Sequence, residues 1–220
     1  MVAWSGYLST DELLKVRDAA IITGIARTDS RLDALLSGID PFFAAALSGA
    51  GDVLMRLFYT ARPGGGLLGW ATFPVELEGD PTMDGVVILD SALPDGTSRA
   101  FSLGRTAVHE VGHWLGLYHT FQDGCTGLGD EVKDTPAHAG PNFGQPVDDG
   151  QPYNLCGGEP AGSLCPIHNY MNYCDDVWMT EFTPGQKERA WAQIGMFRTG
   201  LLPAGGGANR IRESGASIEW

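Results

Sequence analysis

The first hundred residues carry a pattern of apolar and polar positions that predicts helices followed by strands. Ser9 and Glu12 fit a capping box, the side-chain pair that begins many helices, and apolar residues follow at helical spacing. The helices are predicted over residues 10–22, 31–36 and 41–47. Alternating or continuous apolar runs then predict strands over residues 53–60, 67–73 and 85–89.

The second half alternates between helical and irregular patterns. A helical pattern runs over residues 102–117 and is followed, over 122–164, by a stretch rich in Gly, Pro, Asp and Asn. Such a long irregular stretch is expected to be functional, or held by disulfides and ions. Thr183, Pro184 and Gln186 combine a capping box with proline at the first helical position, which predicts a helix ending at Gly200. The remaining residues are predicted to form a loose tail.

Composition and charge narrow the function. The chain has 220 residues, 43% of them hydrophobic, which is typical of a globular domain. Its net charge of −13 disfavours binding to nucleic acid, because phosphate backbones are negative too. No stretch reaches the roughly 18 apolar residues of a membrane-spanning helix, so no membrane association is predicted. The first 15 residues do not have the pattern of a signal peptide.

The four cysteines all lie in the loop-rich second half, at Cys125, Cys156, Cys165 and Cys174. An even number of clustered cysteines favours two disulfides and an oxidising, extracellular compartment. A zinc site built from cysteine alone is the alternative, but no pair has the C-x-x-C spacing typical of such sites.

The clearest chemical signal is the motif H-E-x-x-H-x-x-G-x-x-H, which begins at His109. His109 and His113 are four residues apart, so a helix places both imidazoles on one face, within reach of one zinc ion. Glu110 lies beside them and is the candidate general base for a zinc-bound water. A catalytic zinc needs a third protein ligand, and His119 supplies it if Gly116 adopts a positive φ and turns the chain back.

This motif resembles that of the metzincin clan of zinc peptidases. The clan also has a Met-turn beneath the metal, and Met171 within Asn-Tyr-Met-Asn-Tyr fits that position. Tyr173 matches a Met-x-Tyr arrangement in which the tyrosine binds zinc or stabilises the oxyanion. Taken alone, Met171 and Tyr173 would be interpreted as core residues. His138 and His168 lie outside the motif and are predicted to be ordinary loop histidines.

Within the clan, the wider pattern is similar to the pappalysin family, in particular its cytophagalysin-like branch of secreted bacterial and fungal enzymes. The matching stretches are residues 65–74, 84–89, 103–106, 129–136, 169–176 and 179–186. The resemblance implies an α+β, two-lobed metzincin-type catalytic domain. A mixed twisted sheet with the active-site helix above it would form the upper lobe. The lower lobe would be loop-rich, with the Met-turn and a C-terminal helix.

The resemblance also implies ligands and bonds outside the zinc motif. Gly65 and Gly66 lead into an expected edge strand, to which an extended peptide can add as a further strand. Asp130 and Thr135 match a segment that contributes to calcium binding in some members; ordinary solvated loop side chains are the alternative. The family pairing of cysteines implies the disulfides Cys125–Cys165 and Cys156–Cys174. Family members often carry a cysteine where this chain has Trp178.

The expected organisation is a poorly matched helical segment over 1–51, a catalytic domain over 52–200 with its lobes meeting near residue 119, and a tail over 201–220. The predicted function is a secreted zinc endopeptidase acting on extended protein or peptide substrates. A zinc- and calcium-binding module without turnover, and a zinc hydrolase for a non-peptide amide, are the alternatives. The oligomeric state is not predicted.

Overall fold

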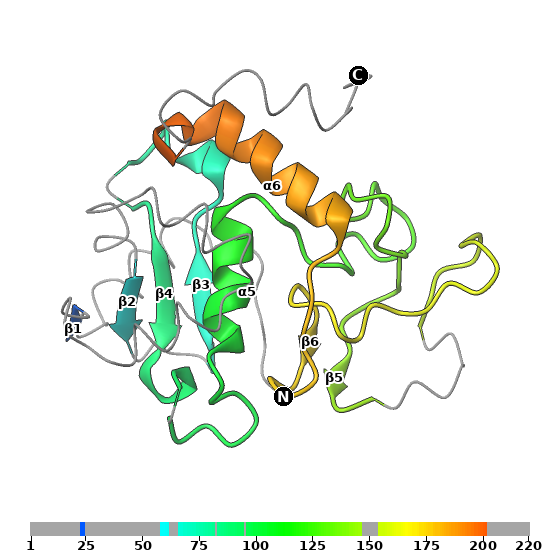
Figure 1. Ribbon diagram of the computed structural model, residues 1–220, viewed down its shortest axis with the longest axis horizontal. Helices are drawn as coiled ribbons and strands as arrows, with labels where there is room; N and C mark the ends of the chain where they lie inside the picture. The colour runs from blue at the N-terminus through cyan, green and yellow to red at the C-terminus, as the bar shows by residue number, and fades with distance from the viewer. Residues whose placement is uncertain are drawn as a thin grey trace.

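The computed structural model describes residues 23–24, 58–61, 66–81, 83–94, 96–146 and 154–201 (Figure 1). The helices predicted over residues 10–22, 31–36 and 41–47 and the tail predicted after Gly200 lie outside these ranges, apart from Leu201. Within the described residues, no helix is both long and apolar enough to cross a membrane.

A small mixed sheet forms one side of the molecule (Figure 1). Its strands are β1 (Thr23–Gly24), β2 (Phe58–Ala61), β3 (Gly69–Ala71) and β4 (Val86–Leu89), in the order β1-β2-β4-β3. The pair β2–β4 is parallel, whereas β1–β2 and β3–β4 are antiparallel. The strands predicted over 67–73 and 85–89 are therefore present but shorter, and β3 lies at an edge as expected. Proline at position 74, which has no backbone N–H, begins the 3-10 helix η2 (Pro74–Glu76) soon after β3.

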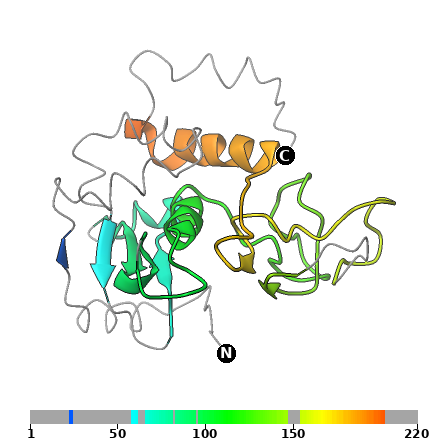
Figure 2. The same cartoon turned by 60° about the horizontal axis from the view of Figure 1, so that its bottom comes forward.

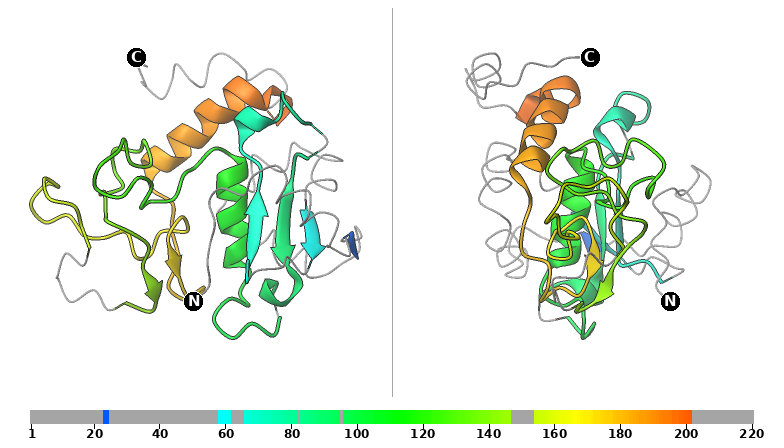
Figure 3. Two further views of the ribbon diagram at one scale, coloured as in Figure 1. Left: turned by 180° about the vertical axis from the view of Figure 1, so that it is seen from behind. Right: turned by 90° about the vertical axis from the view of Figure 1, so that its right-hand side faces the viewer.

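Helix α5 (Arg105–Trp114) packs along one face of this sheet, against β3 and β4 (Figures 1 and 3). Its buried side chains include Ala107, Val108 and Val111, which meet Val86 and Ile88 of β4 in one hydrophobic core. The helix is shorter than the predicted range of 102–117. Gly104 before it and Gly116 after it both adopt positive φ, which ends the regular helical geometry on each side.

The second half is loop-rich and is covered by helix α6. The strand β5 (Phe143–Gly144) pairs in parallel with β6 (Tyr173–Cys174), a pairing that the sequence did not predict. Helix α6 (Pro184–Phe197) has the predicted capping box, and the short 3-10 helix η4 (Thr199–Leu201) follows it. The 3-10 helix η3 (Asp90–Ala92) precedes α5. Figure 2 shows α5 lying between the sheet and α6.

The cysteine pairing differs from the one implied by family resemblance. Cys125 forms a disulfide with Cys156, which lies 31 positions further along the chain. Cys165 and Cys174 are buried free thiols, and each approaches Asn142. The pairs implied by the resemblance, Cys125–Cys165 and Cys156–Cys174, are therefore wrong, and so is the prediction of two disulfides. The physical reason is position, since β6 holds Cys174 beside Asn142 in the core.

Candidate metal centre

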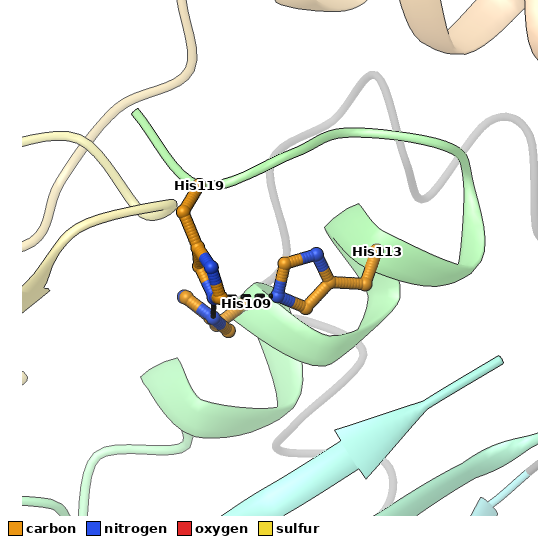
Figure 4. Close-up of side chains that lie close together, drawn as sticks. All are labelled: His109, His113 and His119. Carbon is orange, nitrogen blue, oxygen red and sulfur yellow. Dashed lines mark hydrogen bonds between the residues drawn. The ribbon is translucent and has the colours of Figure 1, made fainter. Parts of the chain in front are cut away.

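Three buried imidazoles converge beside helix α5. His109 and His113 project from the helix, and His119 reaches the same point from the chain that turns back after it (Figure 4). The Nε2 atoms of His113 and His119 are 2.9 Å apart, and those of His119 and His109 are 3.2 Å apart. Imidazoles sharing a tetrahedral zinc at about 2.0–2.1 Å would place these nitrogens roughly 3.3 Å apart. Among the described residues, these histidines form the one group of three or more His, Cys, Asp or Glu side chains placed to share an ion.

Backbone carbonyls fix which nitrogen of two rings is free to bind a metal. The Nδ1 of His109 lies 2.6 Å from the carbonyl oxygen of Tyr170, and that of His113 lies 2.8 Å from the carbonyl of Leu117. A carbonyl can only accept, so each Nδ1 must carry the proton and donate it. In the neutral rings the Nε2 lone pairs are then turned toward each other. This is the arrangement of metal-ligating histidines with their outer hydrogen bonds in place.

Burial keeps these rings neutral. Desolvation, and after it the charge of His113, holds the pKa of His109 well below its usual range. Desolvation lowers the pKa of His113 to about 4 and that of His119 well below normal. Neutral imidazoles with inward-facing lone pairs fit a zinc ion by their donor chemistry.

Glu110 lies between the helix and the edge strand β3. A Cβ atom built on Gly69 of β3 would come within 2.8 Å of the Glu110 Cγ and 2.9 Å of its Oε1, so the strand passes directly against this side chain. Glu110 is 2% exposed, and burial raises the pKa of its carboxyl well above the usual range. A divalent cation at the histidines would favour the ionised carboxylate again.

The turn that carries His119 back is a Schellman motif, a helix ending in which a left-handed residue follows the last turn. Leu117 N donates to the Gly112 carbonyl, and Gly116 N donates to the His113 carbonyl. Gly116 has φ +95°, and a Cβ there would also lie 2.5 Å from the Cγ of Gln193 in α6. Glycine is required at this position both for its backbone conformation and for the close approach of α6.

Met171 lies under the helix, directly against Gly112. A Cβ on Gly112 would overlap the Met171 sulfur, and Met171 is fully buried. Its backbone N donates to Asn169 Oδ1, and its carbonyl accepts from Thr120 N, the residue after His119. The turn at Met171 therefore makes two contacts. It packs against helix α5 between His109 and His113, and it bonds to the segment that carries His119.

Tyr173 completes the cluster on the side of His119. Its hydroxyl lies 3.0 Å from His119 Nε2, and its ring packs edge-on against the ring of Phe121. Phe121 in turn stacks on the imidazole of His119, with ring centroids 4.8 Å apart. Burial, and after it the charge of Glu110, raises the pKa of Tyr173, so its hydroxyl keeps its proton and can donate it in a hydrogen bond.

The sequence profile of one peptidase family, described as pregnancy-associated plasma protein-A (Peptidase_M43), matches residues 68–194, more than half of the 220-residue chain. The chain belongs to the Peptidase_M43 family. The resemblance to pappalysins drawn from the sequence is thereby confirmed. The matched range begins just before β3 and ends within α6, so it contains all three histidines, Glu110 and the Met171 turn.

Fungal relatives of this Peptidase_M43 chain are named extracellular metalloproteases. One from Pyricularia oryzae is 45% identical over 147 residues, which cover 66% of this chain and 50% of the relative. One from Colletotrichum graminicola is 43% identical over 151 residues, covering 67% and 52%. The chain therefore spans about half the length of the curated relatives it matches.

Solved structures of mirolysin share the fold. Mirolysin in complex with compound 9 has a TM-score of 0.56 and 36% identity, covering 66% of this chain and 55% of that one. Mature mirolysin of Tannerella forsythia in complex with a cleaved peptide has a TM-score of 0.57 and 31% identity, covering 74% and 63%. The α+β, metzincin-type fold predicted for this Peptidase_M43 chain is confirmed.

Asp130 and Thr135, the residues predicted to bind calcium, form a polar cluster in the loop region that follows α5. The Thr135 hydroxyl lies 2.7–2.9 Å from both carboxylate oxygens of Asp130 and from the Val132 carbonyl. Asp130 is 4% exposed, and burial raises the pKa of its carboxyl to about 6, although hydrogen bonds from Thr135 and Val132 act in the opposite direction. The cluster gathers oxygen atoms of the kind that calcium prefers.

Sequence reasoning missed several polar residues around the centre. His138 lies in the irregular region outside the histidine cluster, as predicted, but it is fully buried, and its Nε2 lies 2.9 Å from the hydroxyl of Thr120. Asp176 accepts from Leu103 N and Arg105 N, and so caps the start of α5 from 71 to 73 residues away. Local spacing cannot reveal partners so distant along the chain. His168, by contrast, is partly buried and contacts the Trp178 carbonyl.

Proposed function

We propose that this chain is the catalytic part of a zinc-dependent endopeptidase that cuts extended protein or peptide substrates. The observation that supports it most is the convergence of three neutral imidazoles, each with its Nε2 turned inward, beside the helix that also carries the buried carboxylate of Glu110. His109, His113 and His119 would hold the zinc. Three protein ligands leave one position open, as in catalytic rather than structural zinc sites.

Glu110 would act as the general base. Zinc held by the histidines would supply a Lewis acid that acidifies water and polarises the scissile carbonyl. The Glu110 carboxylate would take a proton from the attacking water and deliver it to the leaving amine. Its burial against β3 excludes bulk water from this transfer, and the position of Gly69 leaves room for the carboxylate.

Tyr173 would stabilise the oxyanion. Its neutral hydroxyl lies beside the His119 Nε2, which places a hydrogen-bond donor within the centre itself. Donors aimed at a developing negative charge are worth more in a buried site than in water.

The substrate would lie along β3. In the described sheet this strand is paired with β4 on one side only, so its other edge can bind an extended peptide backbone as an added strand. Glu110 packs against this same strand, so a peptide there would pass close to the base. The edge strand also argues against a small non-peptide amide as the natural substrate.

Two further proposals concern a calcium site and the location of the protein. We infer that the Asp130–Thr135 loop binds calcium, supported by its cluster of buried oxygen atoms. We also infer secretion, supported by the Cys125–Cys156 disulfide and by fungal relatives named extracellular metalloproteases.

Cleavage of a quenched fluorescent protein substrate tests the proposal. The wild type should cleave it, a transition-metal chelator should abolish cleavage, and readdition of zinc should restore it. Glu110→Ala should retain zinc yet lose about 10²–10⁴-fold in rate, the usual contribution of a general base. A wild type that binds one zinc per chain but cuts nothing would instead favour a metal-binding module without turnover.

A further inference from the structure

Helix α6 holds the turn between the second and third histidines through two arginines. The turn follows the C-terminal end of α5, and α6 crosses directly over it (Figures 1 and 2). Arg198 donates its Nε–H to the Trp114 carbonyl at 3.0 Å, and Arg189 donates its Nε–H to the Gly116 carbonyl at 2.9 Å. Arg189 lies within α6, and Arg198 is the residue that follows its last turn. The two backbone carbonyls that they bind are two residues apart.

The hydrogen bonds within the turn show which carbonyl group depends on an arginine for its partner. A helix end leaves its last carbonyls without partners inside the helix. The Schellman motif provides partners for the carbonyls of Gly112 and His113, but not for that of Trp114. Arg198 supplies the partner for Trp114, so the end of the helix is completed by a residue 84 positions away.

Arg198 is itself locked in place. Its two terminal nitrogens each lie 2.7 Å from an Asp84 carboxylate oxygen, and its guanidinium lies 3.9 Å from the centre of the Trp114 ring. Its side chain is 3% exposed. Asp84 also accepts from the Trp114 indole N–H and the Thr72 hydroxyl, which ties the cluster to the sheet. Only the planar fork of arginine can make this carboxylate pair and the carbonyl bond together.

Arg189 makes the second attachment. Besides the Gly116 carbonyl, it pairs with Glu131 at 2.6 Å and lies 4.6 Å from the centre of the Tyr118 ring. Gln193, one turn further along α6, fills the space over Gly116. The chain between His113 and His119 is therefore held by α6 from one side.

We propose that Arg189 and Arg198 are positioning residues for the third metal ligand. They hold the turn in one conformation, in which the imidazole of His119 lies beside those of His109 and His113. The inference rests on the proposed zinc site but not on peptide cleavage. Residues that orient a ligand from outside the coordination sphere commonly change metal affinity by 10- to 100-fold.

Zinc release provides the test. The full chain is loaded with zinc, mixed with excess chromogenic chelator, and the release rate is compared among the wild type, Arg189→Gln and Arg198→Lys. Arg99→Gln, which changes an exposed arginine away from the turn, is the matched control. Unfolding temperatures of the zinc-free proteins and absorption spectra of the cobalt-loaded proteins are recorded in parallel.

The proposal predicts zinc release about 10- to 100-fold faster in Arg189→Gln and Arg198→Lys, with altered cobalt spectra. Arg99→Gln should stay near the wild type, and Arg189→Gln should lower the zinc-free unfolding temperature by only a few degrees. If Arg198→Lys does not fold, the zinc-release rate and cobalt spectrum of Arg189→Gln decide the test. Wild-type release and spectra in Arg189→Gln would overturn the inference and leave the proposed protease standing. A wild type that binds no zinc would overturn both.

Discussion

At the scale of single residues, the zinc motif predicted which side chains would meet. The helical spacing of His109 and His113 and the bend at Gly116 are local properties, and the structure brings these histidines together with His119. The contacts that surround the histidines could not be predicted in the same way. The carbonyl partners of Arg189 and Arg198 lie 73 and 84 residues away, and only the packed fold places them.

The hydroxyl of Tyr173 gives a prediction about catalysis. Tyr173→Phe should lower kcat by about 10²–10³-fold, the usual cost of one lost oxyanion donor, while KM and zinc content change little. Steady-state kinetics and metal analysis of the purified variant measure this. Phe143→Leu, at a partly exposed ring beside Tyr173, serves as the comparison. A Tyr173→Phe enzyme with wild-type kcat would assign the hydroxyl a packing role.

The contact between Gly112 and Met171 gives a prediction about stability. Gly112→Ala should reduce the free energy of unfolding by about 1–3 kcal/mol, because the new methyl group must displace a fully buried methionine. Gly140→Ala is the control, since a Cβ there meets open space. Denaturant titration compares the two. Equal stabilities would show that Met171 is free to move and does not support the helix.

At the scale of elements, local signals predicted the two α-helices of the described residues, α5 and α6, better than the loops. The capping box at Thr183 and Gln186 begins α6 where expected, because both partners lie within one turn. The pairing of β5 with β6 brings together Phe143 and Tyr173, which lie about thirty residues apart in the sequence, so no local periodicity predicts it. The disulfide was mispredicted for a related reason, since four cysteines allow three pairings and packing chooses among them.

The cysteine arrangement can be checked by alkylation and mass spectrometry. Burial raises the pKa of both free thiols to about 12, so Cys165 and Cys174 should not react with iodoacetamide at pH 8 in the folded protein. Both should react after unfolding without reductant. Cys125 and Cys156 should react only after reduction. Four cysteines that stay unreactive until reduction would mean that a second disulfide exists.

At the scale of the whole molecule, the candidate centre joins parts that are distant in sequence. Helix α5 carries two of the histidines, the turn under α6 carries the third, and the Met171 segment supports both. A metal at this point would therefore stabilise the packing of the sheet side against the loop-rich side. Family resemblance predicted this arrangement, whereas composition and charge only disfavoured nucleic-acid binding and did not indicate a fold.

Removal of the metal should lower the unfolding temperature. Zinc at about 1,000 times its Kd contributes roughly 4 kcal/mol to the folded state, which corresponds to roughly 10 °C in a chain of this size. Thermal unfolding with and without a transition-metal chelator measures the shift. His119→Ala should show a much smaller shift, because one ligand is missing. A chelator without effect on the wild type would argue against a metal in the core of the fold.

X-ray absorption at the zinc K-edge tests the central claim most directly. For the zinc-loaded wild type we expect three imidazole nitrogens and one oxygen at about 2.0–2.1 Å, with no sulfur. His119→Ala should lose one imidazole from this shell. A sulfur shell at about 2.3 Å would place zinc on Cys165 and Cys174 instead, and would contradict the assignment of His109, His113 and His119 as the ligands.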